Sequence, residues 1–410
     1  MCNSGTRARP AEIGLPGGVL VEQAGQRMAV ISRFRQMLRS DLESSEAERQ
    51  FGKGWISGVG ALVLAIAGFL LVVCLRFPSW FTVPQIRSLY EQPMFRIALQ
   101  VGLIGAFLLA IISLVLRQTK ALGFTALFFV VLATTLGGAR TEAEVTTASP
   151  VFFGMDWFVL NVIFTGLLFV PIEMLFPRRR GQELFRVEWR EDLFYYLVSS
   201  MMVQCLTYAS LWPALQLTAH THWSGFRAAI ASQPVVVQFL EIMFLTDLVQ
   251  YWVHRAFHRF PFLWNFHAVH HSAKVMDWMS GARMHFLEII ALRGTTVIPM
   301  YILGYGESAL HFYILYVYLH STFIHSNVGW GFPRLGQLIV TPRFHHWHHG
   351  IEKEAIDVNF AIHFPLIDRM FGTHHLPEGQ WPEGYGIAGH PVPVGYWKQF
   401  WYPFRGKAES

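Results

Sequence analysis

Uncharged apolar segments long enough to cross a bilayer recur along this chain and restrict what it can fold into. A membrane-spanning helix needs about 20 mostly apolar residues. Five segments contain no charged residue, namely 55–75, 97–116, 121–139, 157–172 and 193–215. Three more, 235–253, 289–303 and 309–324, are apolar but contain Glu241, Asp247, Arg293 and His320. Polar groups inside a membrane segment usually face the protein interior and mark function. The sequence therefore predicts an all-α, multi-pass transmembrane helical bundle.

Composition agrees with a membrane protein and excludes several other classes. Hydrophobic residues make up 53% of the 410 residues and charged residues 14%, whereas soluble domains have roughly 25% charged residues. The net charge of +5 is scattered, so we expect no nucleic-acid partner. Cys2, Cys74 and Cys205 are far apart, which argues against a thiolate zinc site and against a disulfide scaffold.

The basic residues predict an orientation in the membrane. Because cytosolic loops carry an excess of Lys and Arg, one side is marked by Arg33, Arg35, Arg39 and Lys53, by Arg117 and Lys120, and by Arg178, Arg179 and Arg180. If each span crosses once, residues 254–285 and the tail after Asn327 also reach the cytosol. We therefore predict a polar cytosolic segment (1–54) with a short helix near Arg33–Arg39, N-terminal membrane helices of open role (55–180), and a third domain (181–410) with a cytosolic helical cap.

Histidines are concentrated in that third domain. Thirteen of the 19 lie between His254 and His349. His254 and His258 are spaced i, i+4, and two triplets are spaced i, i+3, i+4: His267, His270, His271 and His345, His348, His349. Residues at these spacings share one face of a helix. Six imidazoles placed in this way would be buried polar groups without obvious partners, so we expect them to bind metal.

Local signals place both triplets on helices. Thr341 can cap a helix and Pro342 fits its first position, and Pro261 has a similar place before the earlier triplet. Two metals with open positions need roughly eight or more ligand atoms between them. Neutral imidazole suits iron, zinc and copper, and spacing alone does not choose among them. The motifs HExxH and GxSxG, typical of zinc proteases and serine hydrolases, are absent.

Several ordered motifs between about Thr246 and Phe404 resemble the fatty acid hydroxylase and sterol desaturase superfamily of membrane histidine-box enzymes. The matching elements are Thr246–His258, Leu263–Ser272, Arg283–Glu288, Phe323–Asn327, Thr341–His349, Asp357–Phe360 and Phe371–Thr373. One departure is Phe286, which stands where the family usually has proline.

The resemblance implies a di-iron centre, the use of O2, and a lipid or sterol substrate. By matching position it implies ten ligands, namely His254, His258, His267, His270, His271, His285, His325, His345, His348 and His349. His320 is a possible additional ligand. Metal-bound imidazoles usually donate their other N–H to a carboxylate or carbonyl, so we expect Asp247, Glu288, Asp357 and Asn359 to support the ligands.

We therefore predict an O2-dependent oxidoreductase that hydroxylates or desaturates a fatty acyl, sterol or ether lipid. Its electrons would come from a separate carrier of cytochrome b5 or ferredoxin type with a reductase, because the chain has no haem, dinucleotide or ferredoxin motif. A purified form could carry zinc in place of iron. The alternatives are a transition-metal transporter and a metal-binding membrane protein without oxidase activity.

Overall fold

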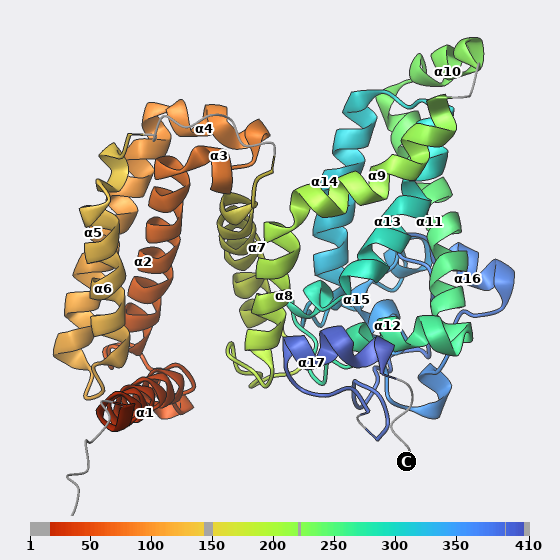
Figure 1. The fold of residues 1–410 in the computed structure, drawn as a ribbon. Coiled ribbons are helices and arrows are strands. Elements are labelled where there is room, and N and C mark those ends of the chain that lie inside the picture. The colour runs from red at the N-terminus through yellow and green to blue at the C-terminus, as the bar shows by residue number, and fades with distance from the viewer. Residues whose placement is uncertain (1–16, 143–150, 220–222, 390, 406–410) are drawn as a thin grey trace, which may run out of the picture. The chain divides into compact units, whose positions relative to one another are not determined.

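A computed structural model describes residues 17–142, 151–219, 223–389 and 391–405. These residues form helices joined by loops and contain no strand beyond two isolated bridges (Figure 1). The chain divides into two compact units, Met1–Phe69 with Arg96–Arg140, and Leu70–Phe95 with Thr141–Ser410. These boundaries differ from the predicted domain limits at residues 54 and 180, because α7 (Met155–Leu175) belongs to the same unit as the histidines.

The first unit is built from four longer helices. They are α1 (Gly17–Leu42), α2 (Trp55–Arg76), α5 (Pro93–Leu116) and α6 (Ala121–Thr135), with the short turns η1 (Glu46–Glu48) and η3 (Gly138–Arg140). The division between the units falls inside α2 and α5. The helix predicted near Arg33–Arg39 is thus part of the longer α1.

Small side chains let the helices of the first unit pack closely. Its core contains Ala61 and Ala65 of α2, Ala106 and Ala110 of α5, and Ala126 of α6, all without exposed surface. Small residues at such contacts are typical of helices that associate in a membrane, where dispersion forces depend on close approach.

A buried ion pair ties α1 to the end of α5. Asp41 and Arg117 are in direct contact, with 0% and 4% of their side chains exposed. Thr119 also donates to the Asp41 carboxylate at 2.6 Å, and the Trp55 indole donates to the Asp41 carbonyl at 3.1 Å. A buried charge needs partners of this kind to offset its loss of hydration.

The second unit contains the remaining helices. The longer ones are α7, α8 (Trp189–Met201), α9 (Val203–Ala219), α11 (Val235–Arg259), α13 (Phe286–Leu303) and α14 (Glu307–His325). The shorter ones are α3 (Pro78–Phe81), α4 (Arg87–Glu91), α10 (Ser224–Ala231), α12 (Pro261–His271), α15 (Pro342–His348), α16 (Pro365–Phe371) and α17 (Tyr396–Trp401), with turns η2 (Pro84–Ile86), η4 (Ser280–Ala282), η5 (Leu335–Gln337), η6 (Lys353–Ala355) and η7 (Tyr402–Phe404).

Within the described residues, six helices are long and apolar enough to cross a membrane, which confirms the multi-pass prediction. They are Trp55–Arg76, Pro93–Leu116, Ala121–Arg140, Met155–Leu175, Val235–Arg259 and Phe286–Leu303. The predicted span 193–215 is instead broken at Met202 between α8 and α9. The predicted span 309–324 corresponds to α14, which does not reach the same hydropathy because polar side chains such as His311 and His320 lie in it.

The short helices that carry the histidine triplets lie at one end of α11, α13 and α14 (Figure 1). α11 ends at Arg259, and Pro261 begins α12 at its first turn. α15 begins at Pro342 as predicted, with Thr341 in the N-cap position. The Thr341 side chain does not make the capping hydrogen bond that the sequence suggested.

Candidate metal centre

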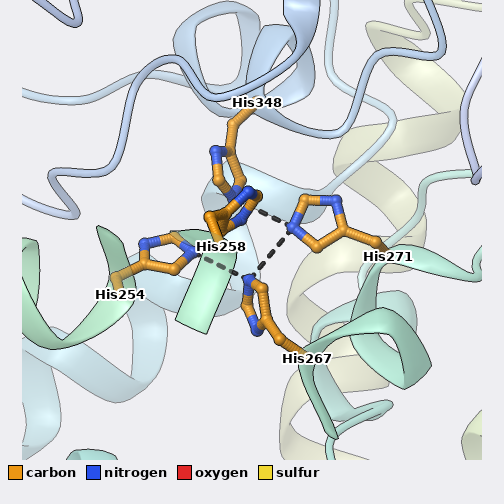
Figure 2. Close-up of side chains that lie close together, drawn as sticks. All are labelled: His254, His258, His267, His271 and His348. Atoms are coloured by element: carbon orange, nitrogen blue, oxygen red, sulfur yellow. Dashed lines mark hydrogen bonds between the residues drawn. The ribbon is translucent and has the colours of Figure 1, made fainter. Parts of the chain in front are cut away.

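One group of five histidines gathers where three helices meet. α11 and α12 contribute two each and α15 one, namely His254, His258, His267, His271 and His348. One ring nitrogen of each lies within 4.8 Å of those of all the others. Figure 2 shows the rings turned toward one another, with the Nε2 atoms of His254 and His271 2.9 and 3.0 Å from that of His267. Two nitrogens bound to one ion at about 2.1 Å lie roughly 3.0–3.4 Å apart, so this spacing suits a metal.

A second group of four histidines adjoins the first. It comprises His270 of α12, His325 of α14, His345 of α15, and His349 in the C-cap position of α15. The Nε2 atom of His325 lies 3.3 Å from that of His270 and 3.0 Å from that of His345. The rings of His271 and His349, one from each group, stack with centroids 4.4 Å apart. Each triplet is therefore divided between the two groups.

Protein acceptors hold the opposite ring nitrogen of most of these histidines. The Nδ1 atom of His254 donates to the carbonyl of Phe360 at 2.9 Å, and that of His348 to the carbonyl of Val358 at 2.7 Å. A carbonyl oxygen can only accept, so Nδ1 carries the proton in each case. The Nδ1 atoms of four further histidines lie 2.5–3.2 Å from a carbonyl or carboxylate oxygen: His258 with Asp357, His267 with Glu288, His270 with Arg283 and His325 with Ser321.

For these six histidines, the outward bond fixes which nitrogen faces the centre of the group. A neutral imidazole with a protonated Nδ1 has a lone pair on Nε2. The Nε2 atoms of His254 and His267 then lie 2.9 Å apart. Because neither atom carries a hydrogen in this tautomer, no hydrogen bond can form between them and their lone pairs repel. A cation between them would turn this repulsion into two ligand bonds. The donor set thus fits a metal ion in each group.

Burial keeps these imidazoles neutral. Desolvation, with a further contribution from neighbouring imidazoles, holds the pKa of His267, His271 and His348 well below the ordinary histidine value. Desolvation likewise lowers the pKa of His270 to about 3. Neutral imidazole is the form that binds metal, so the site needs no deprotonation near pH 7.

Two buried aspartates hold the loop whose carbonyls orient the histidines. Asp247 of α11 accepts from the backbone N–H groups of Ile362 and Phe364, each at 2.7 Å. Asp368 of α16 accepts from the N–H groups of Phe360 and Ala361 at 2.8 Å. Asp247 therefore acts on the segment beyond Phe360 and does not touch a ligand directly. Nothing in the spacing of the sequence indicated Asp368.

Asn359 stabilises the same loop from within. Its backbone has a left-handed φ of +57°, a conformation that Asn tolerates better than most residues. Its amide donates to the carbonyls of Phe344 and His375 at 3.0 and 2.7 Å. Asp357, also left-handed at φ +58°, remains half exposed while its carboxylate faces His258 at 3.2 Å.

An ion network missed by the sequence reasoning supports His270. Arg283, whose carbonyl accepts from His270, has no exposed side-chain surface and donates to Asp192 at 2.5 Å. Arg186 contacts Asp192 and donates to Asp277 at 2.7 and 2.8 Å. Arg186 and Asp192 precede the histidines by more than 60 residues, so only the folded structure relates them to the site.

Two candidate ligands lie outside both groups. His285 caps α13, because its Nδ1 accepts from the N–H of Leu287 at 3.2 Å, and its Nε2 bonds to the carbonyl of Phe400 at 3.1 Å. Both nitrogens of His285 are therefore used within the protein. The Nε2 atom of His320 donates to the carbonyl of Val340 at 3.0 Å. We leave both out of the ligand set proposed below.

Comparison with known proteins relates the part of the chain that carries the histidines to a family. Residues 239–373 match the family model described as fatty acid hydroxylase. That range contains every histidine of the two groups. This part of the chain is similar to the fatty acid hydroxylase family. The resemblance predicted from the histidine motifs is thereby confirmed.

Relatives of this chain differ in how much of each chain they share. An ornithine lipid hydroxylase from Rhizobium tropici is 29% identical over 266 residues, which cover 62% of this chain and 77% of that protein. An alkylglycerol monooxygenase from Caenorhabditis elegans is 24% identical, over 48% of this chain and 38% of its own. A very-long-chain aldehyde decarbonylase from Oryza sativa subsp. indica is 34% identical, over 31% of this chain and 22% of its own. No solved structure matches the chain.

Proposed function

We propose that this protein is a membrane oxidoreductase that uses two iron ions and O2 to hydroxylate or desaturate a C–H bond of a lipid. The observation that carries the proposal is the convergence of nine imidazoles in two adjoining groups, five and four, within the range that matches the fatty acid hydroxylase family. Lipid oxidation is supported by that match and by relatives named as lipid hydroxylases and monooxygenases.

The proposed reaction needs electrons from outside the chain. In hydroxylation, a lipid C–H, O2, two electrons and two protons give an alcohol and water, and in desaturation they give a carbon–carbon double bond and two waters. Bound iron would supply the redox chemistry with O2. A separate cytochrome b5 or ferredoxin type carrier with its reductase would supply the electrons.

The chain's own residues would prepare and shield the ions. The outward Nδ1 bonds keep the Nε2 lone pairs directed inward, and burial keeps the rings uncharged. Phe360, 1% exposed, packs edge-on against the rings of His258 and His348 at 5.0 and 5.8 Å. Apolar walls of this kind exclude bulk water from reactive species.

A basic surface beside the second histidine group is our candidate docking site for an acidic electron carrier. The Arg178 and Arg179 guanidinium groups lie over the rings of Trp381 and Tyr385, 5.1 and 4.6 Å from the centroids. Tyr385 in turn lies 2.8 Å from Nδ1 of His346, next to His345. Opposite charge speeds association, so replacing both arginines with glutamine should raise the apparent KM for the carrier. An unchanged value would reject this docking site.

We place the metal centre on the cytosolic side because that side is the one marked by basic residues. Arg178, Arg179 and Arg180 follow α7 directly, and positively charged residues favour the cytosolic end of a span. Accessibility of a single cysteine introduced at Arg180 to an impermeant thiol reagent tests this orientation. Labelling from the opposite side only would contradict it.

Lipid profiling with a ligand variant tests the function itself. Cells that express the protein should contain one lipid class with an added oxygen atom or with two hydrogens removed, and the variant with both His348→Ala and His349→Ala should lack that product. His311→Ala is the matched control, because His311 is exposed on α14 and outside both groups. Two irons per chain without any lipid product would reject the oxidase, and metal flux into vesicles would favour a transporter.

A further inference from the structure

A carboxylate near the end of α7 links two segments that are far apart in the sequence. Oε1 of Glu173 accepts from the backbone N–H of Trp278 at 2.8 Å and from that of Asn327 at 2.9 Å. α7 is one of the six candidate membrane spans, and a charged group within a span is costly unless it has partners. Glu173 thus spends its charge on holding these two segments beside each other.

The first segment lies directly against a histidine ring of the second. Trp278 leads into η4, which contains Gly281. A Cβ atom added at Gly281 would lie 3.0 Å from Nδ1 of His325 and 3.1 Å from its Cγ. The absence of a side chain at Gly281 therefore lets the backbone pack closely against the His325 imidazole. A shift of η4 relative to α14 would change this contact and the position of the ring.

The second segment begins at His325 itself. His325 is the last residue of α14, and Asn327 follows it by two residues. The carbonyl of Asn327 accepts from the N–H of Arg178 at 3.0 Å, and its side-chain oxygen accepts from the N–H of Arg179 at 2.9 Å. Together with Glu173, these bonds attach the end of α14 to the end of α7 and to the residues that follow it.

Hydrophobic packing brings the same parts of the chain together. Phe169 of α7, Trp278 and Met279 belong to one buried cluster, against which Leu319 and Phe323 of α14 pack. Apolar contact has no preferred direction, whereas a hydrogen bond weakens steeply away from its best distance and angle. The cluster therefore holds α7, η4 and α14 together, and the two bonds to the Glu173 carboxylate define their relative positions.

We propose that Glu173 is a positioning residue of the four-histidine group, which keeps the His325 imidazole in place through the two segments. The inference rests on the proposed function for the ion and on the structure for the contacts. Nε2 of His325 lies 3.3 Å from that of His270 and 3.0 Å from that of His345, so a displaced ring would reach a shared ion less well. Because Glu173 precedes the matched range 239–373, α7 then belongs to the metal centre and is more than a membrane anchor.

Chelator competition on the full-length, Co2+-loaded protein in detergent tests the inference without turnover. Glu173→Ala should lower the affinity for one of two Co2+ ions by about two- to tenfold, the size expected when one buried hydrogen-bonding group is lost. Glu173→Gln keeps an acceptor oxygen, so its effect on the same ion should be smaller. Gly281→Ala should also weaken that ion, because the added methyl group displaces the His325 ring.

A second background separates positioning from general stability. In the His325→Ala protein, Glu173→Ala should cause no further loss of Co2+ affinity, because the ring that it positions is gone. Asp156→Ala is the matched control. Asp156 is the other acid of α7 and accepts from the N–H of Val83 at 3.0 Å and from the hydroxyl of Tyr90 at 2.9 Å. Its loss should lower stability and leave both Co2+ affinities unchanged.

Three results would overturn the inference. They are equal weakening of both ions, a loss of affinity that persists in the His325→Ala background, and unchanged affinities in both Glu173→Gln and Gly281→Ala. If Glu173→Ala does not fold, Glu173→Gln and Gly281→Ala carry the same test. Selective weakening of one ion in a protein that oxidises no lipid would reject the proposed function and support the positioning role of Glu173.

Discussion

Removal of the Glu288 carboxylate should weaken the binding of one of the two proposed metal ions and leave the binding of the other unchanged. Glu288 is 1% exposed, and one of its oxygens lies 2.5 Å from Nδ1 of His267. That bond keeps the Nε2 lone pair of His267 directed at the other four rings of its group. No residue of the four-histidine group hydrogen-bonds to Glu288 within the described chain.

The expected loss of metal affinity follows from the chemistry of the hydrogen bond between Glu288 and His267. A buried hydrogen bond to a charged group contributes roughly 1.5–3 kcal/mol, which corresponds to about ten- to a hundredfold in affinity. The same range applies to mutations that remove an acceptor from a metal-bound histidine. Glu288→Ala should therefore lower the affinity for one metal ion by about ten- to a hundredfold. Glu288→Gln keeps an acceptor and loses the charge, so its effect should be smaller.

Competition with a fluorescent chelator measures both affinities in one titration. We expect the wild type to release two ions per chain, and Glu288→Ala to release one of them at a much lower chelator concentration. Glu307→Gln is the control, because Glu307 is an exposed acid in the first turn of α14. Unchanged affinities in Glu288→Ala would refute the role of the bond. Equal weakening of both ions would show that Glu288 stabilises the fold rather than His267.

Three further predictions concern stability, each measured by thermal unfolding in detergent. Asn359→Ala should lower the unfolding free energy by about 2–4 kcal/mol, because it removes buried hydrogen bonds and places alanine at a left-handed φ. Asn359→Gly should restore the part of that loss that comes from the backbone conformation. Arg117→Met leaves the buried Asp41 carboxylate without its cation and should cost about 3–5 kcal/mol, with metal content unchanged. After chelation, stability should fall as pH drops below 6.5, because burial lowers the pKa of His270 from 6.5 to about 3 and the unfolded state takes up the proton first. The slope is about 1.4 kcal/mol per pH unit for each such histidine, and equal stability at pH 7 and pH 5 would contradict it.

Periodicity in the sequence was enough to place the two triplets on helices, because ligands at i, i+3 and i+4 must share a face. It could not assign His285 or His320, since a helix cap or a carbonyl partner has no pattern in the sequence. The outward acceptors are mostly backbone carbonyls, such as those of Phe360 and Arg283. Any residue type can supply a carbonyl, so no sequence motif identifies these acceptors.

Span prediction failed for a related reason. Residues 193–215 contain no charged residue, but the helix breaks at Met202. Apolar composition reports the environment of a segment and not the continuity of its backbone. Conversely, Arg293 interrupts an apolar segment that does form a single helix.

The outward bonds of the histidines also link metal binding to folding. Each Nδ1 bond lowers the energy of its own loop, yet together these bonds direct two pairs of Nε2 lone pairs at each other, 2.9 Å apart in His254 and His267 and 3.3 Å apart in His270 and His325. The metal-free fold therefore contains a local repulsion that a bound cation would remove. Because a ligand that binds only the folded state stabilises it, the ions should contribute to the stability of α12 and α15 as well as to the reaction. If the proposed ions bind, the same polar contacts that make the site rigid would also make the stability of the folded domain depend on the metal.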